Sequence, residues 1–298
     1  MGAILQGCQS VFQIILLPPI YIFHIILSFL RYPFNLLLQP MPPKRKKGNS
    51  YSKWFIGLTI TLAVAGIAYL VFLWAANQRT SFVQYKEFGI PIPTQYGIHG
   101  IDVSRYQQRI SWASVKQMNV RGIQLDFAFI KATEGTGRVD PLYKRNWRKA
   151  KEAGVIRGAY HFFIPWKDGR LQAEHFIKTV TLSTGDMPPV LDIEQLGGSG
   201  NTQLQKELKE WLLIVEEHYG VKPIIYTNAD FYKRHLGRDF DDYPLWVAHY
   251  LQKHQPRISR EWSFWQHSEQ GRVNGILSKV DFNVFNGDTV AFRSILLP

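Results

Sequence analysis

The chain of 298 residues has almost no cysteine, and Cys8 is the only one. A single cysteine excludes an intrachain disulfide framework and any metal site built from several cysteines. The histidines do not replace them, because His249, His254 and His267 lack the spacing of a zinc motif. The sequence also lacks a phosphate-binding glycine loop, a long internal repeat and a low-complexity tract. We therefore expect a protein that uses no metal ion and no cofactor.

Acidic residues are missing from residues 1–53, although lysine and arginine are present there. The formal net charge of +12 therefore divides into +6 for this stretch and +6 for the remainder. Nucleic acid is the usual partner of a strongly basic chain. Here, however, the basic run at 44–47 lies between two apolar segments. This arrangement indicates a membrane and not nucleic acid as the partner.

Charged residues are also missing from Trp54 to Trp74, a run of 21 residues. A helix of that length, at about 1.5 Å per residue, spans the roughly 30 Å hydrocarbon core of a bilayer. The denser basic cluster precedes the run, so we expect the chain after Trp74 on the extracytoplasmic side, in the periplasm or at the cell surface. No small-residue cleavage site follows, which favours an uncleaved anchor over a removed signal peptide.

Composition divides the chain into four parts. Residues 1–53 are an apolar segment followed by a basic cytoplasmic stretch, and 54–74 are the transmembrane helix. Residues 75–97 are a linker stiffened by proline, and 98–298 are the main folded domain. Two alternatives stay open for the start of the chain. Either residues 11–30 form a first membrane helix, or translation starts at Met41 and residues 1–40 are not translated.

Short apolar strands alternate with amphipathic helices in the last part. Strands are expected at 98–103, 127–131, 156–162, 190–193, 224–227, 245–249, 263–266 and 280–283. Helices are expected at 112–118, 141–153, 169–181, 202–219 and 231–236. Strict alternation predicts a parallel sheet with crossover helices. The fold class is therefore α/β, an irregular (β/α)8-like TIM-type barrel with eight strands and about five helices, preceded by the N-terminal transmembrane helix.

Two acids, Asp192 and Glu194, follow the apolar strand expected at 190–193. Side chains alternate along a strand, so both point to the same face. They are costly to bury without a role, and the alternative is that they are simply hydrated or cap the next helix. Active sites of barrels lie at the carboxyl ends of the strands. Other polar residues are expected at these ends, namely Asp102, Glu134, Tyr160, Tyr226, Tyr250, Gln266 and Asp281.

Six blocks along the chain carry a resemblance to a known family. They are DVSRYQ at 102–107, FAFIKATEG at 127–135, RGAYHFF at 157–163, PVLDIE at 189–194, WQ at 265–266 and VDFN at 280–283. In this order they closely resemble the glycoside hydrolase family 25 lysozymes, the Chalaropsis-type muramidases, over roughly residues 98–287. The resemblance implies a barrel with fewer helices than strands. It also implies hydrolysis of the β-1,4 bond between N-acetylmuramic acid and N-acetylglucosamine in peptidoglycan, whose glycan strands are then the partner.

The resemblance also implies roles for individual residues. It places the family's Asp-x-Glu pair on Asp192 and Glu194, its first-strand aspartate on Asp102 and its last-strand aspartate on Asp281. The tyrosines near the scissile sugar correspond to Tyr160 and Tyr226. From the residues themselves, Glu134, Trp246 and Gln266 are further candidates for substrate binding. The alternative for Trp246 is the barrel core, and His161 is expected to be structural.

Glu194 is the expected general acid and base, with a pKa raised by repulsion from nearby carboxylates. Asp192 is expected either to attack the sugar or to stabilise the substrate's own 2-acetamido group as the nucleophile. The second route is favoured, and either gives net retention. Two other functions stay open: a non-catalytic cell-wall glycan-binding protein, and a hydrolase of another N-acetylhexosamine polymer such as chitin. The sequence does not indicate an oligomeric state.

Overall fold

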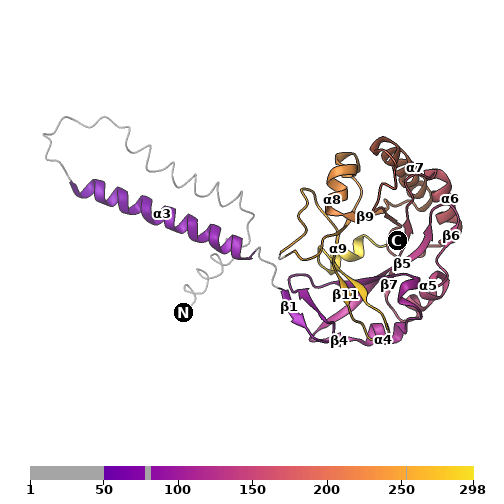
Figure 1. Cartoon of the computed structure of the whole chain (residues 1–298). Coiled ribbons are helices and arrows are strands. Elements are labelled where there is room, and N and C mark those ends of the chain that lie inside the picture. Colours follow the sequence, from indigo (N-terminus) through magenta and orange to yellow (C-terminus); the bar gives the residue numbers. More distant parts are fainter. Residues whose placement is uncertain (1–49, 78–81, 253) are drawn as a thin grey trace. The chain divides into compact units, whose positions relative to one another are not determined.

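The computed structural model describes residues 50–77, 82–252 and 254–298 (Figure 1). The chain divides into two compact units, Met1–Leu70 and Val71–Pro298. The expectations for residues 1–49, including a first membrane helix at 11–30 and a start at Met41, lie outside the described residues. Cys8 lies outside them too.

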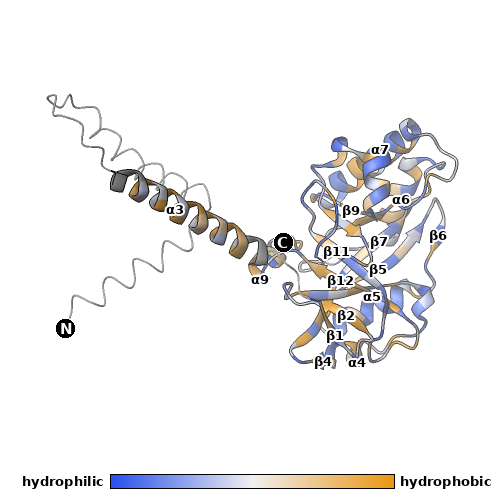
Figure 2. Cartoon of the chain, turned by 60° about the vertical axis from the view of Figure 1, so that its left-hand side comes forward, coloured by the Kyte–Doolittle hydropathy of each residue, from blue (hydrophilic) through white to orange (hydrophobic). Residues whose placement is uncertain are grey.

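Helix α3 (Ser50–Asn77) contains the uncharged run found in the sequence. Its segment Trp54–Trp74 has a mean hydropathy of 2.3 and none of it is buried. Figure 2 colours most of this helix as hydrophobic. By length and composition, α3 is the one helix of the described residues that suits a membrane span.

Eight strands close into the predicted barrel. They are β3 (His99–Val103), β5 (Ile123–Glu134), β7 (Ile156–Phe162), β8 (Val190–Asp192), β9 (Ile224–Asn228), β10 (Leu245–Ala248), β11 (Phe264–Gly271) and β12 (Val280–Phe285). The order around the barrel is β3-β12-β11-β10-β9-β8-β7-β5, and pairing of β3 with β5 closes it. Each strand expected from the sequence is present. Two short strands, β4 (Asn119–Val120) and β6 (Arg138–Val139), pair with β5.

Strand β12 runs against its neighbours, whereas the other barrel strands are parallel to one another. The connection from β11 to β12 is too short for a crossover helix, so the chain turns back directly. The reversal places the start of β12, and not its end, beside the carboxyl ends of the other strands. Asp281 therefore lies opposite Asp102 in the register of β12 and β3.

The five expected helices are present, as α4 (Trp112–Gln117), α5 (Tyr143–Glu152), α6 (Gly169–Thr179), α7 (Asn201–Tyr219), and α8 (Ala229–Phe231) continued by the π-helix η2 (Tyr232–Leu236). Short 3-10 turns, η1 (Arg105–Gln107) and η3 (Arg238–Phe240), were not expected. A terminal helix, α9 (Thr289–Ser294), was not expected either. Its first turn is capped by the side chain of Asp288, which accepts from the backbone N–H of Ala291 at 2.8 Å.

Aromatic side chains fill the barrel interior below the site. Phe129 stacks on Trp246 with ring centroids 4.2 Å apart, and Phe127 meets Phe264 at 5.3 Å. Phe292 of α9 packs on Phe127 at 5.6 Å. Because this packing occupies the lower part of the barrel, space for a ligand remains at the carboxyl ends of the strands.

Residues 82–96 differ from the extended linker expected for 75–97. Strands β1 (Phe82–Tyr85) and β2 (Ile90–Pro93) form an antiparallel hairpin. Phe88 is fully buried and meets Phe282 with ring centroids 5.2 Å apart, and Ile92 is also fully buried. Proline lacks a backbone donor but is tolerated on such a two-stranded edge. The hairpin is therefore packed on the barrel as part of the Val71–Pro298 unit.

Candidate active site

A cavity of 310 Å³ lies at the carboxyl ends of the barrel strands. Its lining includes Asp102, Tyr106, Lys131, Tyr160, Asp192, Glu194, Tyr226, Trp246, Tyr250, Gln266 and Asp281. Every site residue expected from the sequence is among these except Glu134. Residues far apart in the chain thus bring five carboxyl groups to one cavity, those of Asp102, Asp192, Glu194, Glu269 and Asp281.

Asp102 is held by two amide donors. Its Oδ1 accepts from Gln266 Nε2 and from Asn283 Nδ2, each at 2.8 Å. The orientation of Gln266 is fixed in turn, because its Oε1 accepts from the hydroxyls of Tyr226 at 2.8 Å and Tyr250 at 2.5 Å. Hydrogen bonds to a carboxylate stabilise its charged form. The network therefore favours an ionised Asp102 in spite of its burial.

Asn283 was not singled out from the sequence, although it ends the VDFN block. Its Oδ1 accepts from Trp246 Nε1 at 2.8 Å, which leaves its Nδ2 to donate to Asp102. Trp246 itself is only 1% exposed. It forms the floor of the cavity through its stacking on Phe129, and so has the core position that was the alternative to sugar stacking.

Asp281 and Asp102 form a hydrogen-bonded carboxyl pair. Burial, followed by the charge of Asp102 and the hydrogen bond to it, raises the pKa of Asp281 to about 9. Burial also raises the pKa of Asp102, while the bonds from Asn283, Gln266 and Asp281 lower it. Two carboxyl groups in contact do not both ionise at neutral pH. We assign the shared proton to Asp281 and the charge to Asp102.

Asp192 ends β8 and is 7% exposed. Burial raises its pKa well above the ordinary value, the charge of Glu194 adds to this, and Lys131 opposes it. Its Oδ1 has no hydrogen-bond partner among the described residues. A buried acceptor without a partner costs about 1–3 kcal/mol. This acceptor is buried as well as unpartnered, so contact with solvent does not relieve the cost.

Glu194 lies just beyond the end of β8, where its side chain is open to the cavity and to solvent. Burial raises its pKa, a hydrogen bond with Tyr226 lowers it, and the charge of Asp102 raises it. The like-charge repulsion expected from the sequence is present, but burial is the larger cause. The result is a carboxyl group that keeps its proton to a higher pH than an ordinary glutamate.

Tyr160 and Tyr226 both line the cavity, as expected. Burial raises the pKa of each phenol well above its usual value, and the charges of Asp102 and Asp192 add to the effect. Both hydroxyls therefore stay protonated throughout the physiological range. They are available as neutral hydrogen-bond partners beside the acids.

Glu134 is held outside the cavity lining by two cations. Its carboxylate pairs with Lys131 Nζ at 2.9 Å and with Arg138. Lys131 does line the cavity and lies over the ring of Phe162 at 4.5 Å. The period of two along β5 shows why, because Lys131 follows Phe127 and Phe129 on the inward face. The same alternation in the sequence could have identified Lys131, which was not among the expected site residues.

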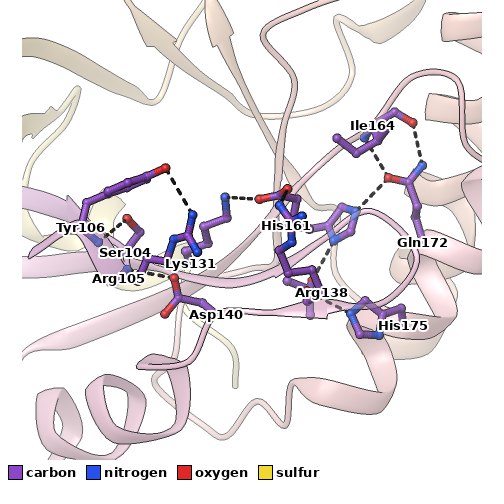
Figure 3. Close-up of polar contacts among 12 residues, drawn as sticks. Ser104, Arg105, Tyr106, Lys131, Arg138, Asp140, His161, Ile164, Gln172 and His175 are labelled. Atoms are coloured by element: carbon purple, nitrogen blue, oxygen red, sulfur yellow. Dashed lines mark hydrogen bonds and ion pairs between the residues drawn. The ribbon is translucent and has the colours of Figure 1, made fainter. Parts of the chain in front are cut away.

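Figure 3 shows the polar contacts on this side of the barrel. Arg105 donates its backbone N–H to Asp140 at 2.8 Å and its guanidinium contacts the Tyr106 hydroxyl at 3.5 Å. His161 hydrogen-bonds Thr133 through Nδ1 at 2.7 Å and Gln172 through Nε2 at 3.3 Å. Burial lowers the pKa of His161 to about 3, so the ring is neutral. It is the structural histidine that was expected.

A second cavity, of 560 Å³, adjoins the first and shares Glu194, Tyr226 and Tyr250 with it. Its other walls come from the segment after β9 and the loop after β10. The described residues contain no group of three or more His, Cys, Asp or Glu side chains placed to hold a metal ion. The arrangement is thus one of paired acids in an elongated cleft, as acid–base cleavage of a glycosidic bond requires.

Comparison with known proteins identifies the family. The model named "Glycosyl hydrolases family 25" matches residues 101–276. The uncharacterized protein YegX of Escherichia coli K12 is 49% identical over 72% of this chain and 82% of its own length. Lysozyme M1 of Streptomyces globisporus is 36% identical over 67% of this chain and 71% of its own.

A solved structure of a family 25 glycosyl hydrolase from Bacillus anthracis has the same fold. It superimposes with a TM-score of 0.64 at 31% identity, covering 71% of this chain and 99% of that one. The matched family model covers more than half of the sequence, and the fold agrees with it. The chain belongs to glycosyl hydrolase family 25 and is a glycoside hydrolase.

Proposed function

We propose that this glycoside hydrolase is a lysozyme, an N-acetylmuramidase. It hydrolyses the β-1,4 bond between N-acetylmuramic acid and N-acetylglucosamine in peptidoglycan with net retention. The proposal rests on four of the carboxyl groups that line one cavity at the carboxyl ends of the strands, those of Asp102, Asp192, Glu194 and Asp281. The similarity to lysozyme M1 supports the substrate class.

Glu194 is the proposed general acid and base. Its raised pKa keeps a proton available near neutral pH, and its exposed position beyond β8 suits transfer to a leaving-group oxygen. After the leaving sugar departs, the same carboxylate takes a proton from the attacking water.

Asp192 is the proposed partner of the substrate's 2-acetamido group. Its side chain lines the cavity and would accept the amide N–H, while the amide oxygen attacks the anomeric carbon. The positive charge that develops on the amide would favour the ionised form of Asp192. Direct attack by Asp192 on the sugar is the alternative. A thioacetamide analogue trapped as a stable ring supports the first route, and a glycosyl–Asp192 adduct in the mass spectrum supports the second.

Asp102 and Asp281 are proposed to support this chemistry by charge. Asp102 is fixed by Gln266 and Asn283 and holds a negative charge near the reacting sugar. A fixed negative charge stabilises an oxocarbenium-like transition state without reorganisation. Asp281 keeps its proton and serves as a hydrogen-bond donor to Asp102.

Segment Trp54–Trp74 is the proposed membrane anchor, with the barrel on the extracytoplasmic side. Its length, its mean hydropathy of 2.3 and the basic residues before it support this orientation. Peptidoglycan lies on that side of the membrane, so the anchor and the proposed substrate agree. Residues 1–53 would then form the cytoplasmic part.

Digestion of purified polymers tests the proposed activity. The full chain in detergent is expected to release reducing ends from peptidoglycan and not from chitin, and mass analysis is expected to find N-acetylmuramic acid at the new reducing ends. Equal digestion of chitin would instead support a hydrolase of another N-acetylhexosamine polymer. Binding to peptidoglycan without new reducing ends would support the non-catalytic glycan-binding alternative.

A further inference from the structure

The second cavity contains two cations that the proposed mechanism does not use. Lys233 comes from η2 and Arg257 from the loop after β10, and both line the cavity that reaches Glu194. Both side chains are exposed. The cavity of 560 Å³ lies in the size range of sites for small ligands. It is therefore large enough for a substituent of the glycan as well as for a sugar.

The acidic residue nearest in sequence to Lys233 in this cavity, Asp230, already has an ion-pair partner. Besides Glu194, the acid that lines the cavity is Asp230, which pairs with Arg234 Nε at 2.9 Å. Within the described residues, neither Lys233 nor Arg257 forms an ion pair with an acidic side chain. Their positive charges are thus available to an anionic ligand.

Local structure fixes the segments that carry both cations. Lys233 lies on a π-helix, a rare element that occurs often at functional sites. The backbone N–H of Arg257 donates to His249 Nδ1 at 3.1 Å, which ties the loop to the end of β10. Burial and then the charges of Arg257 and Lys233 lower the pKa of His249. The histidine is therefore neutral, and the two cations set the charge of this end of the cleft.

We propose that Lys233 and Arg257 form an anionic-substituent subsite that binds a carboxylate of the peptide stem on muramic acid. This inference rests on the proposed muramidase function. The guanidinium offers a planar pair of donors that matches a carboxylate, and the lysine adds a point charge. A glycan of N-acetylglucosamine alone carries no such anion. The subsite therefore selects glycan strands whose sugar beside the scissile bond bears a stem.

The proposed subsite affects which glycan the enzyme prefers, and not the rate of bond cleavage itself. Charged contacts in a solvent-open cavity are individually modest and are screened by salt. We expect the Lys233→Gln/Arg257→Gln double variant to lose about 10-fold in kcat/KM on stem-bearing glycan, mainly through KM. On the same glycan after carbodiimide coupling has converted its carboxylates to neutral amides, its kcat/KM is expected to stay within about 2-fold of the wild type.

The test compares the full chain and its variants in detergent on both glycans. A Lys144→Gln/Lys178→Gln double variant removes the same charge from exposed positions on α5 and α6 and is expected to match the wild type on both. Equal losses on the untreated and the amidated glycan, or no loss on the untreated one, would overturn the subsite. Raising the salt concentration is expected to narrow the difference between wild type and the Lys233/Arg257 variant.

A wild type that cleaves neither glycan would count against the proposed function and not against the subsite. Binding then decides the question. The subsite requires that the double variant bind stem-bearing glycan about 10-fold more weakly than the wild type. Unchanged affinity would overturn it, whether or not the protein is a muramidase.

Discussion

Asp281 and Asp102 share one proton, and this determines how stability responds to pH. The pKa of Asp281 rises from 3.8 to about 9 in the folded protein. Between these values the unfolded chain has an ionised Asp281 and the folded chain a neutral one. The folded state therefore binds more protons, and stability falls as pH rises. The contribution is fully present below pH 3.8 and is lost as pH rises through about 9.

Asp281→Asn is expected to reduce this pH dependence, because an amide is neutral at every pH and still donates to Asp102. Thermal unfolding from pH 4 to pH 9 is expected to show a shallower fall in Tm for the variant than for the wild type. Activity is expected to stay within about 10-fold, whereas Asp281→Ala loses the donor and more activity. If Tm depended on pH as steeply in Asp281→Asn as in the wild type, Asp281 would not be the carboxyl group that holds the proton.

Glu194→Gln is expected to abolish turnover and leave the fold intact. General acid–base catalysis contributes about 10²–10⁴-fold, so the release of reducing ends from peptidoglycan should fall at least 10²-fold. The side chain is exposed and the change is isosteric, so Tm is expected to stay close to that of the wild type. Glu210→Gln on α7 is the matched control and should retain activity. Substantial hydrolysis by Glu194→Gln would remove this residue from the acid role.

Strands β3 and β5 meet where a glycine makes room for a phenylalanine. A Cβ at Gly100 would lie 2.4 Å from the ring of Phe127, which is fully buried. We expect Gly100→Ala to lower the free energy of unfolding by about 1–3 kcal/mol or more. Gly137→Ala is the control, because nothing lies within 4 Å of its Cβ position. Denaturant titration would measure both, and equal stabilities would contradict the close packing.

The β1–β2 hairpin is expected to contribute directly to the stability of the barrel. Phe88→Ala removes a fully buried ring packed on Phe282 and should cost about 3–5 kcal/mol. Val83→Ala in the same hairpin, at a residue 37% exposed, is expected to cost far less. Thermal unfolding separates the two. Equal, small effects would show that the hairpin behaves as a connector.

At the scale of the whole molecule, the proposed anchor in α3 would decide where the enzyme works. The full chain is expected to sediment with membranes and to resist extraction by high salt, because the binding of Trp54–Trp74 is hydrophobic. Protease added to intact spheroplasts is expected to degrade the barrel and spare residues 1–53. Release of the chain by salt alone, or protection of the barrel, would contradict the anchor and its orientation.

The sequence predicted the eight strands because apolar periodicity is a local property of the chain. It also predicted that acidic residues near the carboxyl ends of strands, such as Asp102 and Asp192, line the cavity. It did not identify Asn283, whose role depends on contacts with Asp102 and Trp246 that form only in the closed barrel. Nor did it place Glu134, since the choice between cavity and ion pair is decided by Lys131 and Arg138.

The hairpin at 82–93 shows a different limit. The sequence IPIP is compatible both with an extended linker and with an edge strand, because each allows the backbone angles of proline. Tertiary packing against Phe282 and Arg272 decides between them, and that information is distant in sequence. The sequence pattern alone therefore placed the start of the folded domain at residue 98, whereas packed structure begins at Phe82.

The reversed strand β12 also has a consequence for the order of events during synthesis. The barrel closes only when β12 inserts between β3 and β11, and β12 is synthesised after the other seven barrel strands. Asn283 and Asp281 reach Asp102 in the same step. A chain in which β12 has not yet paired therefore lacks the charge arrangement proposed for hydrolysis. Closing the sheet and completing the candidate site are one and the same step.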